Sequence, residues 1–191
     1  MEEIEGDFLD IDVAKIKKTL EKLGAKKVFE KKYKRKVLAI NGDYHNTFWV
    51  RVRDEGDKIT LTYKKPLGAG QGAKGTDLGM EEIEVDVSDF DKTVLLLEKI
   101  GLQVCIYEEN FRTRYGLDGV EVDIDSWPLI PTFLEIEGKS WDEVNQTAEK
   151  LGFNPKDMYV CPIGKIYSVY GINVHDYTML TFKKQVKKVD K

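Results

Sequence analysis

The chain has 191 residues, of which 41% are apolar and 10% aromatic, so it can bury a sizeable core and is not wholly disordered. Its formal net charge of −4 argues against a general nucleic-acid binder, since the domains of such proteins are usually strongly basic. No apolar run approaches the ~20 residues of a membrane span, and the acidic residues 1–5 are unlike a secretion signal. With only two cysteines, too few for a disulfide scaffold, we expect a cytoplasmic protein with reduced thiols.

A strand followed by a helix is predicted three times along the chain. Each helix begins after a residue that favours the N-cap position and ends at a glycine, which is typical of helix termini. The strands are residues 3–5, 82–87 and 134–137, the caps are Asp12, Ser88 and Ser140, and the glycines are Gly24, Gly101 and Gly152.

Alternating stretches between these units predict further strands over residues 33–40, 47–53, 58–64, 103–115 and 119–125. About eight strands with few helices, in hairpin order, indicate an α+β fold with a largely antiparallel sheet. We expect one domain over residues 1–191. Within it, the glycine-rich segment 67–79 is predicted to be a mobile loop, the pattern after Pro162 a helix, and the charged tail 183–191 to fray.

The strand faces sort by charge, because side chains alternate along a strand. Some faces carry only basic groups and others only acidic groups. The basic positions are Arg51, Arg53, Lys64, Arg112 and Arg114, and the acidic positions are Glu82, Glu84, Asp86, Glu121, Asp123, Asp125, Glu135 and Glu137. A solvated face usually mixes signs, so the sorting favours a second interpretation over ordinary exposure to water.

In that second interpretation the sheet is curved or closed and the charged faces point inward. Rows of like charge need a counter-charge when they are sequestered. A polyphosphate suits the basic rows, since arginine matches phosphate oxygens in a bidentate fork, and a divalent cation such as Mg²⁺ suits the acidic rows. The pattern therefore predicts a site for a metal–polyphosphate complex.

The residues that carry this pattern resemble the motifs of the CYTH superfamily, also called triphosphate tunnel metalloenzymes. Five motifs occur in that family's order over residues 1 to about 152, and the CyaB-type class IV adenylyl cyclases are the most similar branch. The motifs are Glu3-Ile4-Glu5, Arg51-Val52-Arg53, Leu61-Thr62-Tyr63-Lys64, Glu82-Ile83-Glu84 and Phe133-Leu134-Glu135-Ile136-Glu137.

The resemblance implies an antiparallel eight-stranded β-barrel, or tunnel, with helices packed outside it. It also implies Mg²⁺ or Mn²⁺ as cofactor and a triphosphate substrate. The implied phosphate-binding residues are Arg51, Arg53, Lys64, Arg112 and Arg114, the implied metal ligands are Glu3, Glu5, Asp125, Glu135 and Glu137, and Glu82, Glu84 and Asp123 would contact these groups from behind. Catalysis would fall to Glu3 and Glu5 together with the phosphate-binding cations.

Two positions depart from the family pattern. The first motif of the family ends in lysine, whereas this chain has Asp7 there. The family also has a K-x-R strand motif, and here Asn110 stands in place of its lysine, two residues before Arg112. Both changes remove positive charge from the implied phosphate site.

Other features allow more than one interpretation. Trp127 could stack on a nucleobase, although packing in the core is favoured. The basic run 31–36 could be a nucleic-acid patch, but it fits better as a strand with a solvated outer face or with an inner face that adds cations to the tunnel.

The sequence predicts a metal-dependent enzyme acting on a triphosphate, either by cyclising ATP to cyclic AMP or by hydrolysing a nucleoside, inorganic or thiamine triphosphate. The alternative is a non-catalytic protein that binds triphosphate or polyphosphate. A third possibility is an interaction protein whose charged strand faces are simply solvated. We expect no nucleic-acid partner and no membrane partner, and the sequence leaves open whether the chain forms a homodimer.

Replacing Asp7 by lysine tests the alignment of the first strand. If Asp7 shares the inner face with Glu5, Asp7→Lys removes a repulsion and strengthens tripolyphosphate binding by roughly 1–3 kcal/mol, less at high salt. Titration calorimetry at low and high salt measures this. The contrary case is a bulge near Gly6 that turns Asp7 outward. Unchanged or weaker affinity at low salt would mean that Asp7 does not stand in the place of the family lysine and that the alignment of the first strand is wrong.

Overall fold

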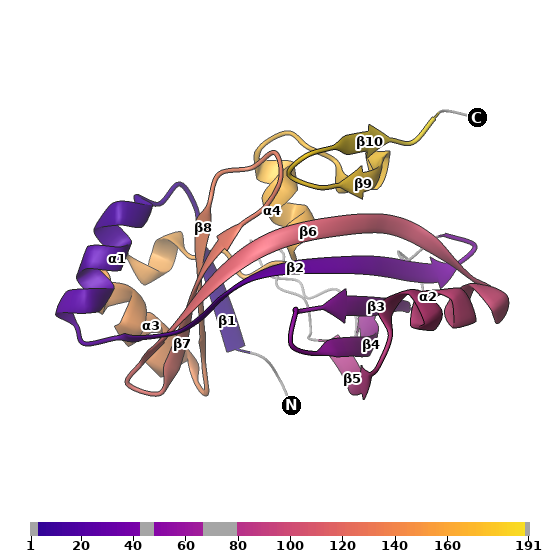
Figure 1. Ribbon diagram of the computed structural model, residues 1–191. Coiled ribbons are helices and arrows are strands. Elements are labelled where there is room, and N and C mark those ends of the chain that lie inside the picture. The colour runs from indigo at the N-terminus through magenta and orange to yellow at the C-terminus, as the bar shows by residue number, and fades with distance from the viewer. Residues whose placement is uncertain (1–3, 43–47, 67–79, 190–191) are drawn as a thin grey trace.

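The computed structural model describes residues 4–42, 48–66 and 80–189. Its centre is a curled sheet whose main path runs in the order β1-β8-β7-β6-β2-β3-β4-β5 (Figure 1). All neighbours on this path are antiparallel, which confirms the predicted α+β class and sheet type. The strands are β1 (Ile4–Phe8), β2 (Lys26–Ile40), β3 (Trp49–Asp54), β4 (Ile59–Pro66), β5 (Met80–Val87), β6 (Leu102–Leu117), β7 (Val120–Ser126) and β8 (Phe133–Gly138).

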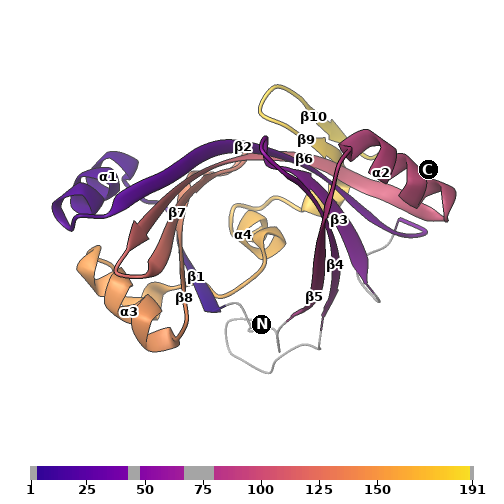
Figure 2. The same ribbon diagram turned by 60° about the horizontal axis from the view of Figure 1, so that its bottom comes forward.

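The sheet bends into an arch (Figure 2). The long strands β2 and β6 form its roof, β7, β8 and β1 one wall, and β3, β4 and β5 the other. In the described residues β1 and β5 end the path and are not joined by hydrogen bonds, so the eight-stranded tunnel is an open arch here. The free edge of β1 is partly occupied, because the amide of Asp7 donates to the carbonyl of Tyr159 at 2.8 Å and the amide of Tyr159 donates back at 2.9 Å.

Three helices cover the outside of the arch, as predicted: α1 (Val13–Lys22), α2 (Phe90–Lys99) and α3 (Trp141–Lys150). Asp12 and Ser140 cap α1 and α3. The cap of α2 is Asp89 and not Ser88, because the Asp89 carboxylate accepts a hydrogen bond from the amide of Lys92 at 2.9 Å. None of the helices in the described part of the chain could cross a membrane.

These helices determine which strand faces point inward. Leu20 of α1 and Val144 of α3 pack with the buried side chains of Val122, Leu134 and Ile136 on β7 and β8. In the same way α2 buries Phe90 and Val94 against Val50 and Val52 of β3. Because side chains alternate along each strand, the charged positions between these apolar residues point to the concave inner face.

A fourth helix, α4 (Ile163–Val169), lies on the concave side (Figure 2). The sequence predicts this helix, but the expectation that all helices pack outside the barrel is wrong for α4. Ile166 and Tyr167 are buried against Val37, Ile106 and Phe133, which line the inner face at this end of the arch. The apolar inner face at this end needs a cover, and α4 supplies it.

Trp127 follows β7 and belongs to this inner core. Its side chain is 6% exposed and meets the Tyr167 ring edge-on, with 6.4 Å between the ring centroids. Packing in the core is therefore the correct interpretation of Trp127, and the ring is not available to a nucleobase.

The C-terminal segment contains more structure than the sequence indicates. Strands β9 (Tyr177–Leu180) and β10 (Gln185–Lys187) form a hairpin, and β9 pairs with β6. The prediction of a frayed tail from residue 183 is thus wrong for β10, because the buried Leu180 anchors the hairpin and the Thr181 amide donates to the Lys184 carbonyl across the turn. Two short 3-10 helices, Pro155–Asp157 and Val174–Asp176, complete the chain, and the predicted loop 67–79 lies outside the described residues.

Removing the hydroxyl of Tyr167 should measure how firmly α4 is held. This hydroxyl is buried and donates to the Pro128 carbonyl at 2.9 Å, so Tyr167→Phe should lower the free energy of unfolding by about 1–2 kcal/mol. Tyr170→Phe is the matched control, because the Tyr170 hydroxyl bonds Asp10 at an exposed position and its loss should stay within about 0.5 kcal/mol. Urea unfolding compares the two variants. Equal losses would show that the Tyr167 bond does not hold the helix in place.

Candidate functional site

The strand register brings the predicted site residues to the same inner face, since residues directly opposite in an antiparallel pair share a face. Arg112 is opposite Asp125, and Glu137 is opposite both Glu121 and Glu5. The predicted residues on this face are Glu5, Arg51, Arg53, Lys64, Glu82, Glu84, Arg112, Arg114, Asp123, Asp125, Glu135 and Glu137. Glu3 lies outside the described residues.

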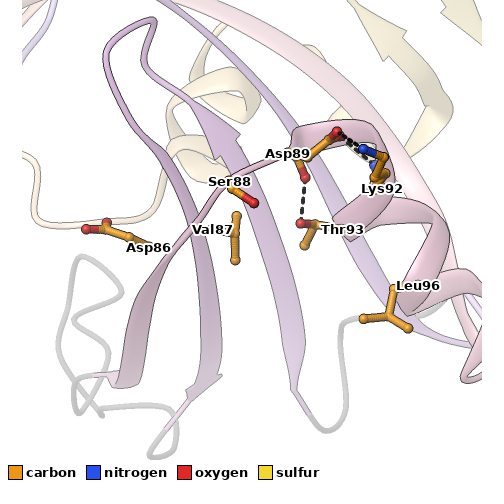
Figure 3. Close-up of a pocket in the computed structure, with 7 residues that line it drawn as sticks. All are labelled: Asp86, Val87, Ser88, Asp89, Lys92, Thr93 and Leu96. Carbon is orange, nitrogen blue, oxygen red and sulfur yellow. Dashed lines mark hydrogen bonds and ion pairs between the residues drawn. The ribbon is translucent and has the colours of Figure 1, made fainter.

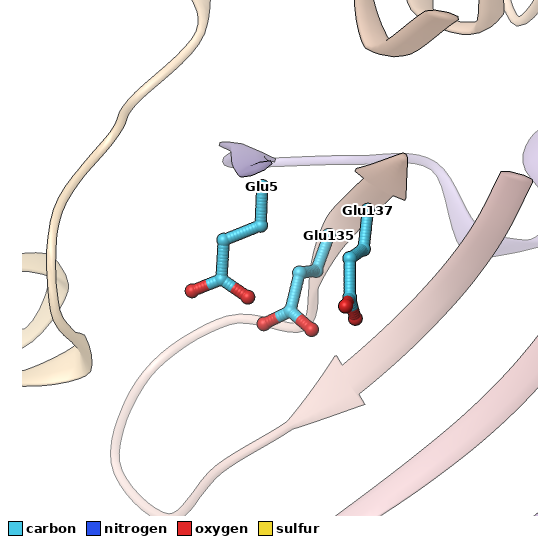
Figure 4. Close-up of side chains that lie close together, drawn as sticks. All are labelled: Glu5, Glu135 and Glu137. Carbon is cyan, nitrogen blue, oxygen red and sulfur yellow. The ribbon is translucent and has the colours of Figure 1, made fainter. Parts of the chain in front are cut away.

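One side of the arch carries an acidic wall, which we define as the inward carboxylates of β1, β7 and β8: Glu5, Asp7, Glu121, Asp123, Asp125, Glu135 and Glu137. Three of them, Glu5, Glu135 and Glu137, offer oxygens that all lie within 4.8 Å of one another. Figure 4 shows these three side chains reaching to the same side of their strands. Such a group of hard oxygen donors can hold a divalent cation.

Arg112 ties the acidic wall together. Its guanidinium contacts Asp125 at 2.6 Å and 2.8 Å, Asp123 at 2.9 Å and Glu135 at 2.8 Å. Desolvation opposes the charge of Arg112, but the nearby carboxylates of Glu135 and Asp125 outweigh it and hold the Arg112 pKa well above its usual value. Asp125, a predicted metal ligand, is thus engaged with Arg112 here.

Arg114 makes similar contacts at the next inward position of β6. It binds the Asp123 carboxylate at 2.6 Å and 2.9 Å, forms an ion pair with Glu121, and lies 3.9 Å from Glu137. Arg112 and Arg114, two of the four arginines expected to bind phosphate, therefore contact carboxylates of the acidic wall in the structure. Their role toward phosphate stays a prediction.

Asp7 belongs to the acidic wall, and the bulge that would have turned it outward is absent. The register of β1 with β8 runs without a shift and sets Asp7 opposite Glu135. Asp7 is 5% exposed, and its Oδ1 has no hydrogen-bond partner among the described residues. Desolvation, together with the charges of Glu5 and Asp125, raises the Asp7 pKa well above its usual range. Glu135 has its pKa raised too, again mainly by desolvation.

The roof and the opposite wall carry an arginine cluster, which we define as Arg35, Arg51 and Arg53. Arg35 of β2 is directly opposite Arg53 of β3. Desolvation, and then the like charges of Arg53 and Arg35, lower the pKa of Arg51 to about 9. The Nε atoms of Arg51 and Arg53 are buried, and neither has a hydrogen-bond partner in the described structure. Each arginine of the cluster has one carboxylate partner, which is Glu108 at 3.0 Å for Arg35, Glu84 at 3.6 Å for Arg51 and Glu55 at 2.6 Å for Arg53. The cluster therefore keeps unused donors at two Nε atoms but is not without counter-charge.

Arg35 is the residue that the sequence did not single out. It lies in the basic run 31–36, whose inner face was expected to add cations to the tunnel. Its guanidinium binds Glu108 at 3.0 Å and stacks over the Trp127 ring at 4.0 Å from the centroid. Arg35 lies directly opposite the inward-facing Arg53, so the pairing of β2 with β3 would have identified it. The sequence alone does not give the register of that pair.

The remaining predicted residues form a small network beside the arginine cluster. Lys64 pairs with Glu82, and Arg51 lies 3.6 Å from Glu84. The Thr62 hydroxyl links the second pair, donating to Glu84 at 2.8 Å and accepting from Arg51 at 3.3 Å. Glu82 and Glu84 thus contact two of the predicted phosphate-binding cations.

Asn110 also faces inward, opposite Tyr33. It is 2% exposed, and its Oδ1 lacks a hydrogen-bond partner within the described residues. The position that departs from the family lysine is therefore a buried, neutral part of the inner face.

A pocket on the outside of the molecule lies between the end of β5 and α2 (Figure 3). Its lining residues are Asp86, Val87, Ser88, Asp89, Lys92, Thr93 and Leu96. The hydrogen bonds inside it belong to the start of α2, where Asp89 accepts from Lys92 and Thr93. None of the candidate site residues lines this pocket.

Comparison with known proteins gives a family for the chain. Residues 43–161, more than half of the chain, match the model of the CYTH domain. No curated protein sequence matches.

Solved structures show the same fold. The PH1012 protein of Pyrococcus horikoshii OT3 is 23% identical with a TM-score of 0.64, over 82% of this chain and 93% of that one. A proposed adenylate cyclase of Vibrio parahaemolyticus is 12% identical with a TM-score of 0.69, over 88% and 98%. HpAC1 of Hippeastrum, described as having a dominant triphosphatase activity, is 13% identical with a TM-score of 0.58, over 88% and 96%.

Loss of charge at Arg112, in the acidic wall, and at Arg51, in the arginine cluster, should change the free energy of unfolding differently. In the absence of ligand, Arg112→Gln should lower the free energy of unfolding by about 3–5 kcal/mol, because it leaves buried carboxylates unpaired. The Arg112 pKa is raised in the folded state, so its stabilising effect is fully present at pH 7.

Arg51→Gln should leave the free energy of unfolding unchanged or raise it. The Arg51 pKa is lowered on folding, so its charge is disfavoured in the folded protein at pH 7. Urea unfolding at pH 7 without phosphate or metal compares the variants. A loss for Arg51→Gln as large as that for Arg112→Gln would mean that the arginine cluster is already balanced by the protein.

Proposed function

The chain belongs to the CYTH family, and we propose that it is a metal-dependent enzyme that acts on a triphosphate bound inside the arch. One observation carries the proposal: a group of three carboxylates and a cluster of three arginines, two of them with unused buried Nε donors, occupy the same concave face. Each gathers like charges in a partly dehydrated space, where a ligand of opposite charge is favoured. A triphosphate with a divalent cation supplies both.

The phosphate chain would be held by Arg51, Arg53 and Lys64, with Arg35 as an addition from the roof. Guanidinium groups bind phosphate oxygens through two parallel hydrogen bonds, and the buried Nε atoms of Arg51 and Arg53 are available for such bonds. Phosphate binding would also bring further negative charge to Arg51, whose carboxylate partner Glu84 lies 3.6 Å away. Thr62, which bonds both Arg51 and Glu84, would hold the Arg51 side chain in place.

The cation would be held by Glu5, Glu135 and Glu137, whose oxygens fit Mg²⁺ or Mn²⁺. When bound, a divalent cation neutralises phosphate charge and polarises the phosphorus that is attacked. Arg112 positions this group, because its contact with Glu135 fixes one of the three carboxylates. Glu3, two residues before Glu5 in the first motif, is proposed as a further ligand by family resemblance.

Two reactions fit a triphosphate in this position. Attack by water on the terminal phosphorus gives hydrolysis of ATP, tripolyphosphate or thiamine triphosphate, and attack by a ribose 3′-hydroxyl on the α-phosphorus of ATP gives cyclic AMP. The similar fold of HpAC1, with its described triphosphatase activity, supports hydrolysis, and that of the Vibrio protein supports cyclisation.

The second candidate is a protein that binds a triphosphate without converting it. Asp7 and Asn110 favour it, because each stands where the family has a lysine on the inner face. In that case tripolyphosphate stabilises the protein and no product forms.

Incubation with ATP, tripolyphosphate and thiamine triphosphate, first with Mg²⁺ and then with Mn²⁺, should release phosphate, pyrophosphate or cyclic AMP. Chelation by EDTA should abolish the release, and Glu137→Gln should reduce it by roughly 10²-fold, since one of three metal ligands is lost. Glu149→Gln on the exposed face of α3 is the matched control and should keep full activity.

Thermal unfolding separates the two candidates. Stabilisation by tripolyphosphate without product would reject the enzyme and retain the binding protein. Neither stabilisation nor product would reject both.

A further inference from the structure

The two walls of the arch are covered unequally on their outer faces. On β8 the outward side chains of Leu134 and Ile136 are fully buried beneath α1 and α3. On the opposite wall α2 buries Val52 of β3 in the same way. Further along that wall, however, the outward side chains of Ile83 and Val85 on β5 are 59% and 50% exposed. The outer face of β5 is therefore an apolar surface that the described residues leave uncovered.

This surface continues onto the neighbouring elements. Leu61 and Tyr63 of β4 lie directly opposite Val85 and Ile83, so they point to the same outer face. Leu96 of α2 is 62% exposed and borders the surface across the outer pocket (Figure 3). Contiguous exposed apolar side chains of this kind mark interaction sites. The outer patch, as we define it, consists of Leu61, Tyr63, Ile83, Val85, Val87 and Leu96.

One end of the outer patch carries two opposite charges. Lys65 of β4 and Glu81 of β5 are directly opposite each other, and both are exposed. Each is two residues from an outward aromatic or aliphatic side chain, Tyr63 or Ile83, so both point to the outer face. One strand of the patch thus ends in a cation and the other in an anion.

This arrangement is complementary to itself. If a second copy is rotated by 180° about an axis that runs along the strands between β4 and β5, its β4 lies over β5 of the first copy. Glu81 of each copy then meets the position of Lys65 in the other. In the same arrangement Ile83 meets the position of Tyr63, and Val85 meets that of Leu61. A two-fold pair of this kind joins apolar groups at its centre and opposite charges at its rim.

We propose that the outer patch is the surface through which two copies of this chain form a dimer, with their β4 and β5 strands stacked face to face. Stacked sheets keep their strand directions within about 30° of each other, which the stated axis satisfies. The inward Glu82, Glu84 and Asp86 of each copy point away from the partner, so their charges do not oppose the pairing.

The position of α2 fits the same arrangement. Because α2 packs on β3, it lies in the layer that the stacked sheet of the other copy enters, and it borders that sheet on one side. Leu96 then lies beside β5 of the other copy. Each exposed edge strand is in this way covered by a helix, which is a common protection of sheet edges.

Size-exclusion chromatography with light scattering across the micromolar range should give the wild type twice the mass of one chain. Val85→Arg puts a charge in the centre of the outer patch on both copies and should give single chains. Leu129→Arg is the matched control and should stay a dimer, because Leu129 has a similar exposure, 48%, in the loop between β7 and β8. Circular dichroism checks that each variant is folded.

A charge exchange tests the stated arrangement. Glu81→Lys has lysine at both rim positions and Lys65→Glu has glutamate at both, so each variant alone should dimerise roughly 10-fold more weakly than the wild type. When the two are mixed, every lysine meets a glutamate of the other chain, and mixed pairs should form with close to wild-type affinity. Sedimentation velocity with a fluorescent label on one variant measures these pairs.

Each contrary result overturns the proposal. A wild type that stays a single chain over this range rejects the dimer, and a Val85→Arg variant that pairs as well as the wild type rejects this surface. Failure of the two charge variants to pair with each other rejects the arrangement. None of these results bears on the inner face, so the proposed function is tested separately.

Discussion

The contact of one guanidinium with three carboxylates is the interaction on which the inner face depends. Arg112 of β6 reaches Asp123 and Asp125 on β7 and Glu135 on β8, so a single side chain links three neighbouring strands. Strand pairing alone would place these carboxylates side by side in a partly dehydrated space, where their repulsion would be severe. With Arg112 in place, the wall tolerates Glu5 and Glu137 beside Glu135, and these three carboxylates can accept a cation.

The same face gathers like charges in two places, and the two groups have opposite sign. Carboxylates outnumber their arginine partners on β1 and β8, whereas guanidinium groups crowd together on β2 and β3. A protein that only had to be stable would replace such groups by apolar ones of similar size, often at no loss. Retaining both groups of like charge on one concave surface is typical of a binding site whose ligand carries both charges.

The features that could be predicted from the sequence are those that depend on residues close together in the chain. Alternation along single strands correctly separates the charged from the apolar faces, and Asp118-Gly119 is predictable as a turn, where both residues adopt positive φ angles of 54° and 88°. The shift of the α2 cap from Ser88 to Asp89 is a choice between two adjacent residues that both favour that position.

Features that depend on distant pairing were not accessible. The spacing of Ile163, Ile166 and Tyr170 predicts a helix but not the side of the sheet on which it packs, which depends on the apolar inner surface at Val37 and Ile106. The burial of Asp7 results from its bridge to Tyr159, more than 150 residues away in the chain. Arg35 became visible as a member of the arginine cluster only once the register of β2 was known.

The end of the sheet at β5 has a consequence for how copies of this protein meet. An edge strand offers unpaired backbone groups on which a strand of another molecule can add. Glu82, Glu84 and Asp86 project from one face of β5, and a second β5 laid antiparallel beside it would bring these rows of carboxylates together. The exposed Ile83 and Val85 on the other face would favour such pairing. The acidic row therefore opposes edge-to-edge association of two copies at this strand.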